Sequence, residues 1–223
     1  MYPVTTTFFY KQQAYSQKDE FIRKTQGSAS PGSTKPGSEN PSGDEGQKPY
    51  EDLYQFLKSE NERLAQTEQA GLVDAFSYQV AGIDLSSYGI EGGIIGFIEI
   101  PSINAIMPIY LGANNYNMSK GAVHLTQTSY PIGGKDTNCV IAAHRGGTNE
   151  MLRNIHKINI GDEVIITNFR EELIYKVVDY KVILPYEINE IKIQKGKDMI
   201  TLISCNPLGA NTHRYIVYCE RVS

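Results

Sequence analysis

The hydrophobic pattern of the chain changes near residue 92. Beyond that point, short runs of apolar and β-branched residues are separated by turn-forming residues, which is typical of strands in an all-β domain. The runs that predict strands are 94–100, 105–110, 139–143, 163–167, 173–178, 180–184, 200–204 and 215–219. Strands at this spacing predict a mainly β fold, a closed eight-stranded barrel with antiparallel or mixed pairing, rather than a parallel α/β sheet. One short helix is predicted over residues 150–158.

The residues before the barrel predict a helical appendage. Residues 50–70 contain large apolar residues at helical spacing with charged residues between them, so an amphipathic helix is expected to lie against the barrel. These apolar residues are Leu53, Phe56, Leu57 and Leu64. A Gly/Ser/Pro-rich stretch before this helix predicts a flexible linker, and the mixed aromatic and charged N-terminal segment is compatible with a further helix. The expected divisions are 1–26, 27–49 (linker), 50–91 (helix and its following segment) and 92–223 (barrel).

Composition narrows the possible functions. The 223-residue chain carries a formal net charge of −4, and its lysines and arginines form no cluster along the sequence. This argues against nucleic acid or an anionic membrane surface as the partner. No run of about 18 apolar residues occurs, so the chain as given predicts neither a membrane span nor a secretory signal. The carboxylates form no dense cluster, and no metal or other cofactor is expected.

The cysteines indicate a reactive site. Cys139, Cys205 and Cys219 are widely spaced and lack a CxxC motif, which suits a free thiol better than a disulfide framework or a zinc site. Cys205 ends one predicted strand, Arg214 opens the next, and His144 ends another strand before two glycines. A thiolate attacks carbonyl carbon, a histidine can serve as its base or imidazolium partner, and an arginine can stabilise an oxyanion. Together the three residues predict a thiol acyl-transfer site.

Seven motifs in the same order make the chain resemble the sortases, and among them the class C, pilin-polymerising branch. They lie at 96–101, 107–110, 121–125, 128–134, 143–146, 201–205 and 206–214. The strand that ends at Cys205 reads Thr-Leu-Ile-Ser-Cys where the family has Thr-Leu-X-Thr-Cys, so a serine replaces the second threonine. Agreement of so many motifs over roughly 94–222 makes the resemblance specific.

The resemblance implies a cysteine transpeptidase that assembles pili. Cys205 would attack the threonine carbonyl of an LPXTG-like sorting signal, His144 would protonate the departing glycine amine, and Arg214 would position the signal or stabilise the tetrahedral intermediate. A lysine amine of another pilin subunit would then convert the thioester to an isopeptide bond. The resemblance also implies a place on the outer face of a Gram-positive cell membrane, with anchoring segments absent from this chain.

The segment before the barrel contains a candidate lid. Class C sortases carry an Asp-Pro-aromatic tripeptide across the active site, and this chain has Asp74-Ala75-Phe76. Asp74 is expected to pair with Arg214, and the Phe76 ring is expected to cover the Cys205 sulfur. Loss of the proline removes a fixed φ, so a more mobile lid is expected. The plainer alternative is that Asp74 is an ordinary loop acid and Phe76 anchors the core.

Other residues of the same types receive plainer interpretations. His124 falls in one of the shared motifs and is a candidate for lining the pocket behind the catalytic residues. His156 reads as a surface residue, and strand alternation should point His213 away from the site. Core or supporting positions are expected for Cys139, Cys219 and Arg145.

Two other functions stay open. The chain could be a housekeeping sortase that attaches proteins to cell-wall peptide, or a catalytically silent barrel that docks pilins. A papain-like hydrolase is disfavoured, because its nucleophilic cysteine precedes its histidine in the chain, whereas here His144 precedes Cys205.

Overall fold

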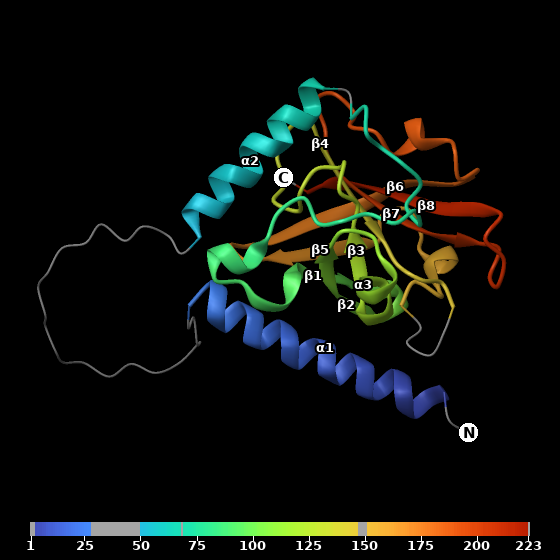
Figure 1. Cartoon of the computed structure of the whole chain (residues 1–223). Helices are drawn as coiled ribbons and strands as arrows, with labels where there is room; N and C mark the ends of the chain where they lie inside the picture. Colours follow the sequence, from blue (N-terminus) through green and yellow to red (C-terminus); the bar gives the residue numbers. More distant parts are fainter. Residues whose placement is uncertain (1–2, 28–49, 68, 147–150, 223) are drawn as a thin grey trace, which may run out of the picture.

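A closed barrel forms the centre of the computed structural model, which describes residues 3–27, 50–67, 69–146 and 151–222 (Figure 1). The strand order is β1-β2-β3-β4-β7-β8-β6-β5, and β1 pairs with both β2 and β5 to close the barrel. The strands are β1 (Ile94–Ile100), β2 (Ala105–Leu111), β3 (Ala122–His124), β4 (Thr137–Ala142), β5 (Glu163–Asn168), β6 (Glu172–Ile183), β7 (Asp198–Asn206) and β8 (His213–Arg221). The pairs β2–β3 and β4–β7 are parallel and the others antiparallel, so the predicted closed, mixed barrel is confirmed.

Two details of the strand prediction are wrong. The runs 173–178 and 180–184 belong to one long strand, β6, whose pairing with β8 shifts register between Val177 and Asp179. An irregularity of this kind bends a strand without ending it, so a polar interruption in the sequence does not mark a turn. Strand β3 was not predicted, because three residues are too few to show an alternating pattern.

The helix predicted over residues 150–158 is also wrong within its described part. Residues 151–154 form turns, and a 3₁₀ turn, η4 (Ile155–Lys157), follows them. The backbone N–H groups of Ile155 and Ile158 donate to carbonyls three residues earlier, at Leu152 and Ile155. The apolar residues of this segment are buried in the core, so their spacing reflects packing of successive turns rather than one α-helix.

Two buried clusters lie on opposite faces of the sheet formed by β4, β7 and β8. Along β7, Ile200 and Leu202 belong to the first cluster, whereas Met199 and Ile203 belong to the second. The first cluster also includes Tyr175 of β6 and residues of β5. These strands do not pair with β4 or β7, so their side chains meet those of β4 and β7 across the barrel interior. The second cluster therefore lies on the outer face, where the segment after α2 covers it.

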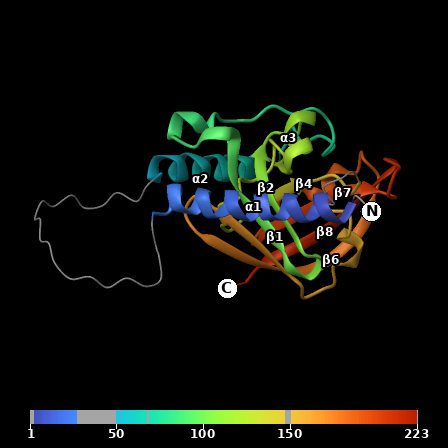
Figure 2. The ribbon, with the colours of Figure 1, turned by 90° about the horizontal axis from the view of Figure 1, so that it is seen from below.

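Helices pack around this barrel. They are α1 (Pro3–Thr25), α2 (Glu51–Gln66) and α3 (Asn115–Lys120), with 3₁₀ turns η1 (Leu85–Tyr88), η2 (Glu91–Gly93), η3 (Pro101–Ile103) and η5 (Ile188–Ile191) in addition to η4. Helix α1 crosses the barrel beside β1 and β2, where Phe21 meets Phe97 edge to face with ring centroids 5.6 Å apart (Figure 2). None of the described helices combines the length and apolar character that crossing a membrane requires. Apart from Gly27, the predicted linker lies outside the described residues.

Helix α2 buries most of the predicted apolar stripe. Leu53, Leu57 and Leu64 are buried, but Phe56 remains partly exposed, and Asn61 occupies the inner face instead. The Asn61 side chain accepts a hydrogen bond from the backbone N–H of Tyr130 at 2.7 Å and donates one to the Tyr130 carbonyl at 3.4 Å. A buried amide that pairs with backbone in this way is satisfied, so this polar contact helps to dock the helix together with its leucines.

Candidate active site

The three residues predicted to carry the chemistry lie at one end of the barrel. Strands β4 and β7 run parallel, so His144, just after β4, and Cys205, near the end of β7, emerge on the same side. Arg214 lies directly opposite Cys205 in the antiparallel pairing of β7 with β8. Alternation along each strand places all three residues on the outer face, the face of the second cluster. Pairing between strands thus brings together residues that are far apart in the sequence.

The three side chains differ in their access to solvent. His144 is exposed, Cys205 is half-buried and Arg214 is 5% exposed. All three nitrogens of the Arg214 guanidinium donate hydrogen bonds: Nη1 donates to the carbonyls of Asn211 and His213 at 3.0 Å each, while Nε and Nη2 donate to the Asp74 carboxylate. The backbone contacts hold the guanidinium in a fixed orientation, so its other two donors point at one place.

The Asp74-Ala75-Phe76 segment occupies that place. Asp74 accepts two hydrogen bonds from Arg214, at 2.8 and 2.7 Å, in a bidentate ion pair. The Phe76 ring stacks on the His144 ring at 6.2 Å between centroids, and the Arg214 guanidinium lies 4.9 Å from the Phe76 centroid. The Ala75 side chain is fully buried in the outer cluster. The segment therefore makes the expected ion pair with Arg214, and its Phe76 ring contacts His144 and Arg214.

Two buried glutamines fix the ends of the lid segment. Before the lid, Gln69 donates to the Gln127 carbonyl at 2.9 Å and accepts from the Ile193 N–H at 2.7 Å. After it, Gln79 accepts from the Thr126 N–H at 2.8 Å. Both glutamines are nearly inaccessible to solvent, so these contacts are costly to break. A movement of the lid would therefore be confined to the residues between them.

The surroundings of Cys205 act on its thiol in opposite directions. Burial raises the pKa of Cys205, the positive charge of Arg214 lowers it, the carboxylate of Asp74 raises it, and Arg145 lowers it slightly. The net effect raises the pKa, so with the lid in place the thiol form predominates at neutral pH. The Asp74 carboxylate also neutralises the charge that would best stabilise a thiolate.

Arg145 has a larger part in this site than its sequence position suggests. Its Nη1 lies 3.5 Å from the Cys205 carbonyl oxygen and bonds closely to the Asn206 side-chain oxygen. Its guanidinium lies 5.5 Å from the Tyr215 ring centroid, and only 8% of the residue is exposed. Arg145 was expected to support the loop after His144, but it reaches across to the end of β7. No local pattern reveals this contact, because it depends on the parallel pairing of β4 with β7.

The other histidines lie in different surroundings. The Nε2 atom of His124 is 3.2 and 3.1 Å from the carbonyls of Thr128 and Ser129, and its ring stacks on Tyr130 at 4.9 Å. Burial lowers the pKa of His124 to about 4, so the ring is neutral. His213 contacts the Thr212 hydroxyl, and His156 is exposed. Within the described ranges, no group of three His, Cys, Asp or Glu side chains lies close enough to hold a metal ion.

A sortase domain model matches residues 98–222, more than half of the chain. The chain belongs to the sortase family. Among curated relatives, Sortase D of Bacillus subtilis is 29% identical over 135 residues, which cover 59% of this chain and 66% of that protein. Sortase A of Bacillus anthracis is 27% identical over 76% of this chain and 84% of its own length.

Solved structures similar to this sortase include class C enzymes. The complex of Streptococcus agalactiae sortase C1 with MTSET superposes with a TM-score of 0.72, at 29% identity over 79% of this chain and 92% of that chain. The Group B Streptococcus Pilus Island 1 sortase C2 has a TM-score of 0.68, at 34% identity over 78% and 99%. Sortase C of Clostridium perfringens SM101 has a TM-score of 0.71, at 29% identity over 93% and 99%. The predicted class C resemblance is confirmed, and sortase homologues are cysteine transpeptidases.

Proposed function

We propose that this sortase is a pilin-polymerising transpeptidase with Cys205 as nucleophile, His144 as acid and base, and Arg214 as the residue that binds the reacting carbonyl. The observation that carries the proposal is the bidentate pair of Asp74 with Arg214, together with Phe76 on His144. A lid whose Asp74 pairs with Arg214 is what the class C resemblance implies. The similarity to class C structures supports the same assignment.

The first half of the proposed reaction forms a thioester. The Cys205 thiolate adds to the threonine carbonyl of an LPXTG-like sorting signal, and the carbonyl oxygen becomes an oxyanion. The Nε and Nη2 donors of Arg214, which the Asp74 carboxylate occupies in the closed state, then bind the signal's backbone or the oxyanion. The bond from threonine to glycine breaks as His144 gives a proton to the departing amine. The threonine acyl group remains on the Cys205 sulfur.

The second half transfers the acyl group to an amine. A lysine side chain of another pilin subunit attacks the thioester carbonyl, His144 takes a proton from that amine, and the sulfur leaves as the thiolate. An isopeptide bond results, and the enzyme returns to its starting state. Water can attack the same thioester slowly when no suitable amine is present.

The lid makes access to the site a separate step in this scheme. While Asp74 holds both donors of Arg214, a substrate carbonyl cannot bind there, and Phe76 occupies the space beside His144. A sorting signal must therefore displace the Asp74-Ala75-Phe76 segment before the thiol can react. The donors that bind the lid are the same donors that the reaction uses.

The proposed partners and location follow from the same assignment. The partners are pilin subunits that bear LPXTG-like sorting signals and acceptor lysines. Sortase homologues of Gram-positive bacteria act at the cell surface, and we place this chain on the outer face of the membrane, held by segments outside it. A housekeeping role in attaching proteins to cell-wall peptide is the second candidate, because proteins named Sortase A are among the relatives. The ion pair of the lid favours the pilin role.

Intact-mass spectrometry with an LPXTG-type peptide tests the chemistry. The chain and its Cys139→Ala variant are expected to gain an adduct equal to the peptide acyl group without its glycine portion, and Cys205→Ala is expected to gain none. Cys139 is a matched control, because it is a second cysteine, buried in the barrel interior. An adduct that persists in Cys205→Ala would remove Cys205 from its role.

A second amine then separates the two sortase roles. A peptide bearing a lysine side chain from a pilin and a cell-wall peptide amine are offered in competition to the acyl-enzyme. Faster transfer to the pilin lysine supports polymerisation, whereas faster transfer to the cell-wall amine supports the housekeeping role. If no adduct forms even after Asp74→Ala and Phe76→Ala open the lid, the enzyme assignment itself fails and the docking barrel takes its place.

A further inference from the structure

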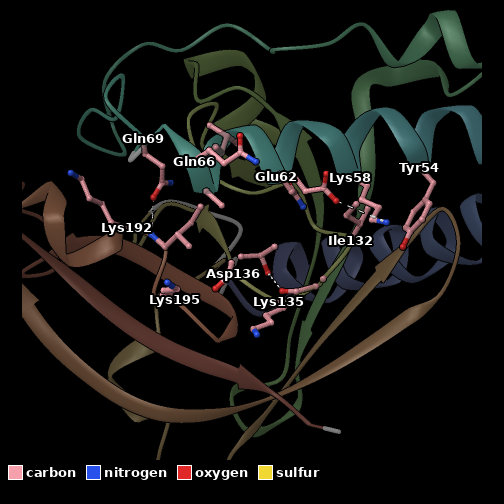
Figure 3. Close-up of a pocket in the computed structure, with 17 residues that line it drawn as sticks. Tyr54, Lys58, Glu62, Gln66, Gln69, Ile132, Lys135, Asp136, Lys192 and Lys195 are labelled. Atoms are coloured by element: carbon pink, nitrogen blue, oxygen red, sulfur yellow. Dashed lines mark hydrogen bonds and ion pairs between the residues drawn. The ribbon is translucent and has the colours of Figure 1, made fainter.

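A groove with a volume of about 740 Å³ separates α2 from two loops at the end of the barrel (Figure 3). One wall is a polar face of α2, which presents Lys58, Glu62 and Gln66 at successive turns. The opposite wall is formed by residues 132–137 together with Lys192, Ile193 and Lys195. The volume lies within the range of ligand-binding pockets, roughly 300–1,000 Å³, so the groove is large enough for several residues of a peptide.

This groove is remote from the active site. Thr137, which lines the groove, begins β4, whereas His144 follows the end of the same strand. At about 3.3 Å per residue, seven extended residues separate the two positions by roughly 23 Å. Strand β7 shows the same arrangement, with Lys195 of the groove shortly before it and Cys205 near its end. A ligand in the groove therefore does not contact the catalytic residues.

Positive charge gathers around the groove although the whole chain is acidic. Four lysines line it, against one glutamate and one aspartate, whereas the chain carries a net charge of −4. The four are Lys58, Lys135, Lys192 and Lys195. Glu62 lies 4.0 Å from Lys58 of its own helix, and the Asp136 carboxylate accepts from the backbone N–H of Gly196. Both acidic groups are thus engaged locally.

Three of the lysines remain available for a ligand. Lys135, Lys192 and Lys195 have no ion-pair partner in the part of the chain that the structure describes. They come from two separate loops that line the groove below α2 (Figure 3). Several unpaired positive charges along one groove favour an anionic ligand.

The lining between the lysines is not purely polar. Ile132, Ile193 and Leu64 contribute aliphatic surface, and Tyr54 contributes a ring. No arginine lines the groove, so the planar fork that favours bidentate phosphate binding is missing from its lining. Carboxylates around an apolar side chain match this combination better than a phosphate polymer does.

We propose that this groove is a second binding site, which takes an acidic peptide segment of a protein partner with an apolar residue between its carboxylates. The carboxylates pair with Lys135, Lys192 and Lys195, and the apolar residue lies against Ile132 and Ile193. Occupancy of this site is measured by binding rather than by turnover.

Fluorescence anisotropy with a labelled Glu-Glu-Leu-Glu-Glu peptide tests the proposal on the whole chain. The chain is expected to bind the peptide saturably, and Lys192→Glu with Lys195→Glu is expected to weaken binding about tenfold or more. Binding is also expected to weaken with added salt. Lys157→Glu with Lys176→Glu makes the same change of charge at exposed positions outside the groove and is expected to bind normally. Thermal melting confirms that both double variants are folded.

Two further peptides and one polymer separate the sources of affinity. Glu-Glu-Ser-Glu-Glu is expected to bind more weakly, because it lacks the apolar side chain, and Gln-Gln-Leu-Gln-Gln is expected not to bind. Absence of saturable binding to the first peptide would overturn the proposal, as would equal weakening by the two double variants. Binding of linear polyphosphate of similar charge as tightly as the peptide would also overturn it, because the groove would then be a general anion site.

Discussion

Cysteine side chains have opposite properties in the barrel interior and at the end of the barrel that the Asp74-Ala75-Phe76 segment covers. Cys139 and Cys219 lie in the interior cluster, 3% and 0% exposed, and burial raises the pKa of both thiols far above the usual range. Cys205 is half-buried at a strand end, where Arg214 and Arg145 counteract part of the effect of burial. The thiols of Cys139 and Cys219 are therefore unreactive, whereas the reactivity of the Cys205 thiol depends on the charged groups around it.

The difference follows from the kind of contact that stabilises each region. The interior buries apolar side chains on neighbouring and opposite strands, and it needs no charge. The lid-covered end depends on one ion pair and a few ring contacts, each of which a substrate can replace. Changes in the interior should therefore alter stability, and changes under the lid should alter reactivity.

The largest effect is expected from replacing Cys205 by alanine, with the same replacement of Cys139 for comparison. Cys205→Ala should reduce acyl transfer by about 1,000-fold or more, because the nucleophile is lost, and leave thermal stability nearly unchanged. Cys139→Ala should leave transfer within about twofold and lower the free energy of unfolding by about 1 kcal/mol, because it leaves a small cavity. Peptide transfer assays and urea unfolding measure the two quantities. A loss of transfer in Cys139→Ala would contradict the division between the regions.

The next effect concerns His124 and stability. Its pKa is about 4 when folded, below the ordinary 6.5, so between these values the unfolded chain binds more protons. The neutral His124 ring therefore contributes fully to the free energy of unfolding above about pH 6.5. This contribution decreases by roughly 3 kcal/mol in total as the pH falls towards 4. Urea unfolding between pH 7 and 4 measures this slope, and His124→Asn should flatten it. A flat slope in the unaltered chain would show that His124 is protonated when folded.

Opening the lid should accelerate the reaction of Cys205. In Asp74→Asn, the carboxylate that raises the thiol pKa is gone, so that pKa should fall, and the ion pair with Arg214 is lost. Alkylation by iodoacetamide at pH 7 should become roughly 30-fold faster, which corresponds to about 2 kcal/mol for hydrogen bonds to a charged group. The midpoint of the alkylation rate against pH should also move to lower pH.

Asp84→Asn is the matched control for this change. Asp84 lies in the same connecting segment, but its carboxylate bonds to Ser86 rather than to Arg214. Its alkylation rate and midpoint should equal those of the unaltered chain. If both variants react at the same rate, the pair of Asp74 with Arg214 does not control access to Cys205.

Arg145→Met should act in the opposite direction on the thiol. Loss of this charge should raise the Cys205 pKa and move the alkylation midpoint to higher pH. Loss of its bonds to the Cys205 carbonyl and to Asn206 should lower kcat about tenfold with little change in KM. Arg145→Lys, which keeps the charge, should restore the midpoint but only part of kcat. A lower melting temperature with an unchanged pH profile would mean that Arg145 only supports the loop.

The smallest effect is expected at the centre of the lid. Ala75→Pro fixes φ at the position where class C sortases carry proline, and a compatible proline stabilises a fold by about 0.4–1 kcal/mol. Alkylation of Cys205 should then slow by about two- to fivefold, while Ala75→Gly should accelerate it. Equal rates in the two variants would show that opening does not involve the backbone at this position.

Most of the barrel strands follow from local sequence, and the three candidate residues are a prediction from the strand ends together with the family motifs. Strands such as β1 and β8 appear in the sequence as apolar runs, because side chains on both faces of these strands are buried. Cys205 and Arg214 are recognisable because each stands at the edge of such a run. The full length of β6 and the presence of β3 were not predicted. The irregularity within β6 resembles a turn in the sequence, and the three residues of β3 are too few to show an alternating pattern.

Sequence alone thus indicated most of the strand-forming segments and the candidate residues His144, Cys205 and Arg214, because apolar runs and short motifs consist of residues close together in the chain. Tertiary structure decided which of these residues meet. The parallel pairing of β4 with β7 brings Arg145 to Cys205 at one end of the barrel, and the pairing of Asp74 with Arg214 closes the site. At the other end, Lys135 joins Lys192 and Lys195, nearly 60 residues later in the sequence, in the lining of one groove. Contacts of this kind depend on the closure of long loops, which no local pattern records.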